Sequence, residues 1–275
     1  MSSADTKTGL EGLVLYDLTN KPGGQLAFSP HCIKSVIDFK ILGLPSSSYE
    51  RRRLSFLQIR DELGAKVGPG TTVPTLGLAN GQTHIVDSWR IAEWLAEHHP
   101  RGERIFGGGG DAGKRIAAFV NEFARSILSP HVAPMGMVPL APLLDEGSRE
   151  YVINDRLTKP RFEAVQAALS SPEKRADNAE QIIKKLAPIE ALLAAQPLGL
   201  SPPAPSSSSG PWLAGTAEPT HADACLFGYF VFTRADPAAH KAIWETAESL
   251  PLLRKWGRAM AEFCGPEIVD DFVLA

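Results

Sequence analysis

The dipeptide Asn80-Gly81 lies between two short runs of β-forming residues, and it constrains the fold more than any other feature of the chain. Asn and Gly tolerate the positive φ angles that a tight two-residue turn requires. Residues 73–78 and 83–86 are therefore expected to pair as an antiparallel hairpin. Directly after it, Asp87-Ser88 is expected to cap a helix that Pro100 closes.

A parallel βαβ unit is expected before this hairpin. Residues 13–18 are nearly continuously apolar, which is typical of a strand buried on both faces. Apolar residues then recur at helical spacing over 30–42, and residues 48–54 favour a strand with one solvated face. With a short helix at 58–65, the first hundred residues are predicted to follow the order β-α-β-α-β-β-α.

The rest of the chain is predicted to be helical. An apolar stripe at helical spacing runs from residue 116 to 128, and we expect this helix to break or kink in the Pro- and Met-rich segment 130–142. Further helices are expected at 148–169 (kinked or divided at Pro160), at 172–195, from Thr220 onward and at 250–263.

The chain is thus expected to fold as an α/β domain followed by an all-α domain. The first domain is placed at residues 13–100, after a flexible N-terminus at 1–12, and the second at 111–275. Residues 101–110 form the predicted linker, and the Pro- and Ser-rich stretch 197–211 is expected to be a solvated loop within the second domain.

Composition excludes several function classes. The 275 residues carry a formal net charge of -3, which offers no attraction for nucleic acid or an anionic membrane. No apolar run approaches the roughly 20 residues that span a bilayer, and no signal peptide is evident. Because the 3 cysteines are widely spaced and odd in number, we expect no disulfide scaffold and no metal site, and a cytoplasmic location.

The segment Phe28-Ser29-Pro30-His31-Cys32 follows the first strand and opens the first helix. Ser29 suits the N-cap and Pro30 the first helical position, so the segment has a purely structural explanation. The N–H groups and the dipole at a helix N-terminus also attract an anion. A cap and an anion site are both consistent with these residues alone.

Three features then occur in a fixed order: Ser29 at the first helix, Val73-Pro74 before the hairpin, and Asp87-Ser88 after it. On the predicted order of strands and helices, this combination resembles the thioredoxin-like domain of the glutathione transferases. The helical half is similar to the second domain of that family through Trp212-Leu213-Ala214-Gly215 and the capping box Thr220-x-x-Asp223. The resemblance covers nearly the whole chain.

Within the family, the first forty residues resemble the bacterial β-etherases and the etherase-like transferases of wood-decay fungi. The resemblance is carried by Tyr16-Asp17-Leu18, by the loop with Lys21-Pro22, by Phe28-Ser29-Pro30 and by Lys34. Ile33 departs from it, since many of these relatives have Trp there. The resemblance implies a homodimer that acts on small aromatic molecules related to lignin and wood extractives.

The resemblance also implies a glutathione site and no metal. It implies a cis bond before Pro74, with the Val73 backbone facing the cysteinyl part of glutathione. The Ser88 hydroxyl would bind the γ-glutamyl carboxylate, and Asp87 would face the ammonium group. For the glycyl carboxylate three side chains remain open: Gln58, Lys34 and Lys66.

Ser29 is then expected to stabilise the glutathione thiolate, which attacks an aromatic electrophile in conjugation or ether cleavage. The alternatives are a non-catalytic carrier of apolar aromatics and a glutathione-dependent thiol reductase that uses Cys32. The acceptor pocket is expected between the domains, with candidate wall residues Phe28, His31, Met135, Met137, Val138 and Leu140.

Overall fold

A four-stranded mixed sheet forms the N-terminal part of the molecule. The computed structural model describes residues 10–108, 110–195 and 210–271. The strand order is β2-β1-β3-β4, and the strands are β1 (Leu13–Leu18), β2 (Tyr49–Leu54), β3 (Thr75–Gly77) and β4 (His84–Val86). Strands β1 and β2 are parallel, whereas β3 is antiparallel to both β1 and β4.

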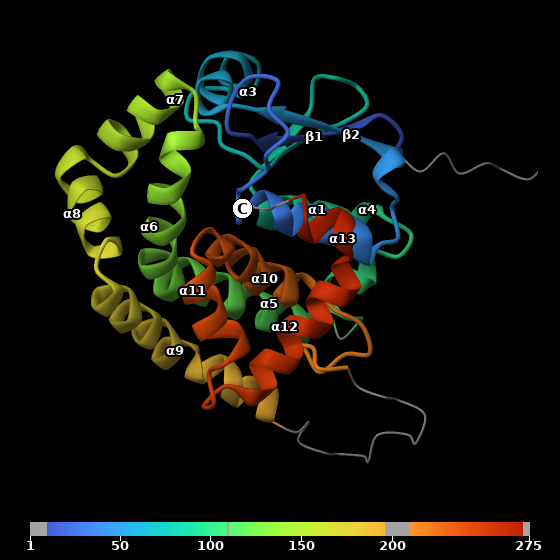
Figure 1. Ribbon diagram of the computed structural model, residues 1–275. Helices are drawn as coiled ribbons and strands as arrows, with labels where there is room; N and C mark the ends of the chain where they lie inside the picture. Colours follow the sequence, from blue (N-terminus) through green and yellow to red (C-terminus); the bar gives the residue numbers. More distant parts are fainter. Residues whose placement is uncertain (1–9, 109, 196–209, 272–275) are drawn as a thin grey trace, which may run out of the picture.

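The predicted hairpin and βαβ unit are both present. The Leu78 N–H donates to the Thr83 carbonyl at 2.9 Å, which closes the turn around Asn80-Gly81. Helices α1 (Cys32–Ile41) and α4 (Ser88–His98) lie on one side of the sheet, and the helical segment ending in α3 (Gly64–Val67) lies on the other (Figure 1). That segment begins with α2 (Phe56–Gln58) and the π-helical turn η2 (Ile59–Leu63).

Most of the remaining described residues are helical, as predicted. Short 3-10 or π-helical turns join many of the helices. The helices are α5 (Asp111–Phe123), α6 (Ser129–Leu140), α7 (Glu146–Tyr151), α8 (Lys159–Leu169), α9 (Pro172–Ala194), α10 (His221–Phe232), α11 (Pro237–His240), α12 (Pro251–Cys264) and α13 (Pro266–Val269). The expected order of an α/β unit followed by an all-α unit is therefore confirmed.

Three local expectations have different outcomes in the structure. Most of the segment 130–142 is helical, because α6 follows the π-helical turn η4 (Ala124–Leu128) and contains Pro134 and Pro139. The expected break occurs at the end of the segment, where α6 stops at Leu140 and the 3-10 turn η5 (Ala141–Leu143) begins. The predicted helix 148–169 is divided, and Pro160 lies in the first turn of α8, where its missing N–H costs nothing. Most of the predicted loop 197–211 lies outside the described residues, as does most of the N-terminal segment 1–12.

Helix α10 is the core of the helical part and is buried along nearly its whole length. It packs against α1 of the sheet unit and against α5 and α12 (Figure 1). Its capping carboxylate, Asp223, accepts the Thr220 and Leu213 backbone N–H groups and the Trp256 indole N–H, at 2.8 to 2.9 Å. The predicted capping box therefore also ties α12 and the 210–220 segment to the start of α10.

Within the described residues, no helix combines the length and the apolar character needed to cross a membrane.

Candidate active site

Ser29 lies at the turn between β1 and α1, and its hydroxyl oxygen acts as the helix cap. It accepts the backbone N–H groups of His31 and Cys32 at 3.3 and 3.2 Å. The Ser29 side chain is 4% exposed and reaches the walls of two neighbouring cavities. Because the oxygen accepts both backbone bonds, the hydroxyl proton is left to donate to an anion at the same helix N-terminus.

The peptide bond between Val73 and Pro74 is cis. Both residues line the first of the two cavities, which has a volume of about 420 Å³. Among the described residues, neither the N–H nor the C=O of Val73 has a hydrogen-bond partner. Free backbone groups on an extended segment are what a peptide-like ligand uses when it binds along a strand.

Asp87 lines the same cavity and caps helix α4. Its Oδ1 accepts the backbone N–H groups of Trp89 and Arg90 at 2.9 and 3.4 Å. Its φ angle is +87°, a backbone conformation that costs free energy for a residue other than glycine. Ser88, the first residue of the helix, is buried at 4% exposure and does not contribute to the cavity wall.

None of the three side chains considered for a carboxylate lines this cavity. Lys34 is 2% exposed and donates from Nζ to Asn121 Oδ1 at 2.8 Å, on the face of α1 that meets the helical part. Gln58 accepts the Ser55 N–H at the cap of α2, and Lys66 is exposed on α3. The positive charges that the cavity does contain come from Arg60 and Arg156, which sequence reasoning missed.

The second cavity, of about 320 Å³, lies between the sheet unit and the helices α6, α8 and α10. Of the expected acceptor residues, Phe28, His31 and Met137 line it. Met135, Val138 and Leu140 do not, because they lie on buried faces of α6. Other lining residues were not anticipated: Ser129, Pro130, Ala133, Pro134, Arg156, Leu157, Arg161, Tyr229 and Phe232.

The two cavities share Leu18, Ser29, His31, Phe56 and Arg156, so they meet at the Ser29 turn. Burial and the positive charges of Lys34 and Arg156 lower the pKa of His31 to about 3. His31 is therefore a neutral imidazole at physiological pH. Its ring packs edge-on against Tyr229, with the ring centroids 6.2 Å apart.

Cys32 follows this turn but is fully buried. Burial raises the pKa of its thiol well above the usual range, and the nearby Asp17 carboxylate acts in the same direction. Asp17 is itself fully buried and accepts Arg51 Nε at 2.8 Å. The Cys32 sulfur is thus a protonated core group, unlike the exposed low-pKa thiol of a redox centre.

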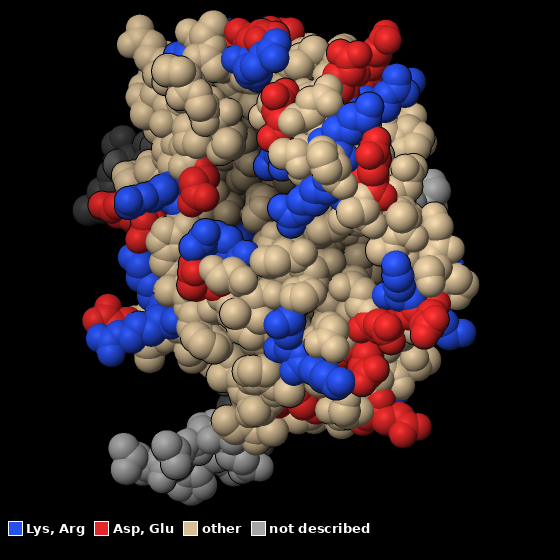
Figure 2. Space-filling view, turned by 90° about the vertical axis from the view of Figure 1, so that its left-hand side faces the viewer, with Lys and Arg blue, Asp and Glu red and all other residues tan. Residues whose placement is uncertain are grey.

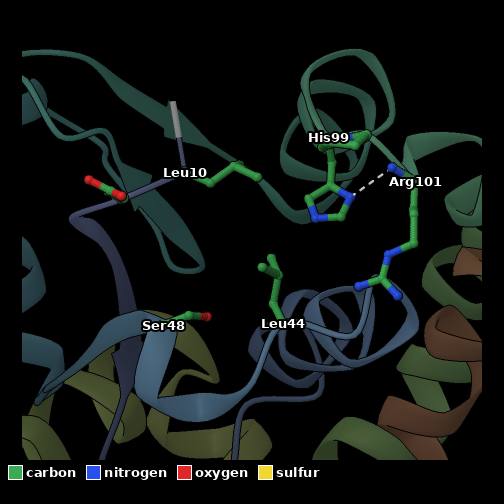
Figure 3. Close-up of a pocket in the computed structure, with 7 residues that line it drawn as sticks. Leu10, Leu44, Ser48, His99 and Arg101 are labelled. Atoms are coloured by element: carbon green, nitrogen blue, oxygen red, sulfur yellow. Dashed lines mark hydrogen bonds between the residues drawn. The ribbon is translucent and has the colours of Figure 1, made fainter. Parts of the chain in front are cut away.

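A further cavity of about 440 Å³ lies elsewhere on the molecule, and Figure 3 shows its lining residues. Leu10 and Leu44 supply apolar walls, and the Arg101 backbone N–H donates to His99 Nδ1 at 3.0 Å. Although this cavity is slightly larger, it contains none of the candidate residues. The Ser29 cavities combine a helix N-terminus, unpaired backbone groups and a strained carboxylate residue, so we place the candidate site there.

No family model and no curated protein matches the chain. Solved structures do match over nearly its whole length. A glutathione S-transferase of Ceriporiopsis subvermispora in complex with glutathione is 20% identical, with a TM-score of 0.66, covering 92% of this chain and 96% of that one. Glutathione transferase GSTFuA3 from Phanerochaete chrysosporium is 21% identical, with a TM-score of 0.67, covering 93% and 97%.

The β-etherase LigF from Sphingobium sp. strain SYK-6 also matches, at 17% identity and a TM-score of 0.60, covering 94% of this chain and 98% of that one. At these identities the likeness concerns the fold. In this chain that fold comprises the mixed sheet, with a cis bond before Pro74, and a helical second half. The chain has the fold of the glutathione transferases, and its structural neighbours include those of wood-decay fungi and a bacterial β-etherase.

Proposed function

We propose that this protein is a glutathione transferase of the etherase-like type that acts on aromatic electrophiles. The observation that carries the proposal is the position of the Ser29 hydroxyl, which two backbone N–H groups orient in the wall shared by both cavities. Glutathione would occupy the first cavity and the aromatic acceptor the second. The glutathione-bound neighbour from Ceriporiopsis subvermispora supports the choice of co-substrate.

Glutathione has polar groups that suit the first cavity. The unpaired backbone groups of Val73, next to Pro74, would pair with the cysteinyl residue. The α-amino group would face Asp87, and the γ-glutamyl carboxylate would lie at the α4 N-terminus, beside Ser88. For the glycyl carboxylate, Arg60 and Arg156 replace the three side chains expected from sequence, because these two arginines line the cavity.

Ser29 would stabilise the reacting sulfur as a thiolate. A free thiol titrates at about pH 8.5, so a hydroxyl donor and the α1 dipole increase the thiolate fraction at neutral pH. The thiolate attacks an electrophilic carbon of the acceptor, a carbon–sulfur bond forms, and the bond to the leaving group breaks. With an aryl ether the bond that breaks is carbon–oxygen, and a phenolate leaves with the electron pair.

The thiol-reductase alternative has less support, because Cys32 is buried with a raised thiol pKa. A non-catalytic carrier would bind aromatics in the same second cavity, and it would differ from the transferase only in having no turnover. The cytoplasmic location and the homodimer stay predictions.

The test compares wild type with Ser29→Ala. A hydrogen bond to a charged group contributes about 1.5–3 kcal/mol, so turnover should fall roughly ten- to hundred-fold. The pKa of the bound glutathione thiol, followed by thiolate absorbance, should rise, while glutathione affinity changes little. Ser171→Ala is the matched control, since Ser171 caps α9 and lies outside both cavities. Unchanged kinetics in Ser29→Ala would reject the role of Ser29, and bound aromatics without turnover would favour the carrier.

A further inference from the structure

The second cavity is mostly apolar, yet two arginines belong to its wall. Arg156 ends a π-helical turn after α7, and Arg161 lies in the first turn of α8. Both side chains are exposed at the rim. No acidic residue lines this cavity. The acceptor would therefore enter a space whose charged lining residues are both positive.

These arginines differ from several other surface arginines in lacking an acidic partner. Arg60, Arg90 and Arg125 each form an ion pair with a carboxylate one to three residues away. Neither Arg156 nor Arg161 forms an ion pair among the described residues, and the Arg156 guanidinium instead lies 5.6 Å from the centre of the Phe56 ring. Figure 2 shows a hollow on the face that carries α7 and α8, with both basic and acidic side chains around it.

Tyr229 adds an independent feature deeper in the same cavity. Its side chain is 1% exposed, and its hydroxyl has no hydrogen-bond partner of good geometry among the described residues. Burial raises the pKa of the phenol, and a hydrogen bond with Ser129 that falls outside good geometry acts in the opposite direction, so Tyr229 stays a neutral donor. A buried hydroxyl without a well-formed hydrogen bond is costly, and a ligand that supplies an acceptor atom would satisfy it.

We propose that the acceptor of this transferase is an aromatic carboxylate. Its ring lies against the apolar wall, which includes Phe28, Met137 and Phe232, and its carboxylate binds Arg161. Tyr229 donates to a polar oxygen at the buried end. The inference rests on the proposed function and narrows its substrate class.

Glutathione itself carries two carboxylates, and Arg156 borders both cavities. Arg161 borders only the second cavity, so its charge is placed for the acceptor. For this reason Arg161 is the residue to change. Arg149 is the matched control, because it is also an exposed arginine on this part of the chain but lines neither cavity.

The test uses para-chloromethylbenzoate and its methyl ester, which differ in the negative charge and by one methyl group. In both, the glutathione sulfur bonds to the benzylic carbon while chloride leaves with the electron pair of the carbon–chlorine bond. The measured quantity is kcat/KM for the carboxylate divided by that for the ester, each corrected for its uncatalysed rate. We expect wild type to favour the carboxylate. Arg161→Gln should lower this ratio about three- to ten-fold, Arg161→Lys should retain most of it, and Arg149→Gln should keep the wild-type ratio.

A binding measurement separates this inference from the proposed function. Calorimetry with naphthoate and naphthamide on glutathione-saturated protein should show that naphthoate binds more tightly. In Arg161→Gln the two ligands should bind with equal affinity. If both electrophiles react but the ratio is unchanged in Arg161→Gln, the anion preference is rejected while the transferase proposal stands. If neither reacts, the transferase proposal fails, and the calorimetry alone decides whether the cavity selects an aromatic carboxylate.

Discussion

Gly228 of α10 faces the Pro30 carbonyl so closely that a Cβ atom at position 228 would lie 2.1 Å from that oxygen. The same atom would be 3.2 Å from a methyl group of Ile33. The missing side chain lets the central helix of the second half support the turn that presents Ser29. The turn that carries Ser29 is thus packed against Gly228, a residue about two hundred positions away in the chain.

We expect Gly228→Ala to displace the Ser29 turn. The clash is with backbone, so relief requires α10 or the turn to move, at a cost of about 1–3 kcal/mol in unfolding free energy. Turnover should fall further than this loss of stability alone implies, because the hydroxyl moves relative to the thiolate. Denaturant unfolding and steady-state kinetics on the same preparation measure the two effects.

Gly64→Ala is the comparison, since its Cβ would meet only the Ile59 carbonyl oxygen, at 3.5 Å. Because alanine has a higher helix propensity than glycine, Gly64→Ala should raise the free energy of unfolding by up to about 1 kcal/mol. A Gly228→Ala protein with wild-type stability and turnover would show that the turn does not depend on this contact.

His31 should make the protein less stable in mild acid. Its pKa is about 3 in the folded state and near 6.5 when unfolded, so between these values only the unfolded state binds the proton. Stability is therefore lost as pH falls from 6.5 toward 3, by about 2 kcal/mol at pH ~5. His31→Gln should lose less stability than wild type between pH ~7 and ~5 in urea unfolding. His98→Gln, at an exposed site, controls for loss of an imidazole. Equal losses in wild type and His31→Gln would contradict the lowered pKa.

Sequence reasoning succeeded where the signal is local. The Asn80-Gly81 turn, the Asp87 cap and the Thr220–Asp223 box each act within a few residues, and each is present in the structure. Ser29 was also identified as a cap, since its hydroxyl bonds to N–H groups two and three residues away.

The charges of the site could not be predicted in the same way. Nearly all of α1 is buried, so its apolar spacing did not reveal that Lys34 faces Asn121 and not the cavity. Arg156 and Arg161 reach the site only because α6 to α8 fold back over the Ser29 turn. Tyr229 lies on a helix that is apolar all round, where no periodic pattern marks the cavity side.

The cysteines should be inert in the native protein. Cys32, Cys225 and Cys264 are all buried, and burial raises the pKa of the Cys32 and Cys264 thiols, that of Cys264 to about 12. Iodoacetamide should label none of them at neutral pH without denaturant and all of them in urea, as counted by mass spectrometry. Cys32→Ala should retain transferase turnover within about two-fold. Rapid labelling of Cys32 in the native state, or reductase activity lost in Cys32→Ala, would revive the thiol-reductase alternative.

A buried ion pair should make the contact between the two halves depend on pH. His221 at the start of α10 lies 2.9 Å from the Asp38 carboxylate of α1, and both side chains are fully buried. Burial alone would lower the pKa of His221, but the Asp38 charge outweighs it, and the pKa rises to about 10. The pair therefore contributes its full stability below pH ~6.5 and loses it as pH rises toward 10.

Asp38→Asn should lower the free energy of unfolding by about 3 kcal/mol at pH ~6, because it leaves His221 buried without its counter-charge. The difference in unfolding free energy between this variant and wild type should become smaller between pH ~7 and ~10, as His221 loses its proton in the wild-type protein. Chemical denaturation over this range, followed by tryptophan fluorescence, measures it. Glu122→Gln, which breaks an exposed pair with Arg125, should stay close to wild type throughout. A difference between Asp38→Asn and wild type that is constant from pH ~6 to ~10 would show that His221 is not charged in the folded protein.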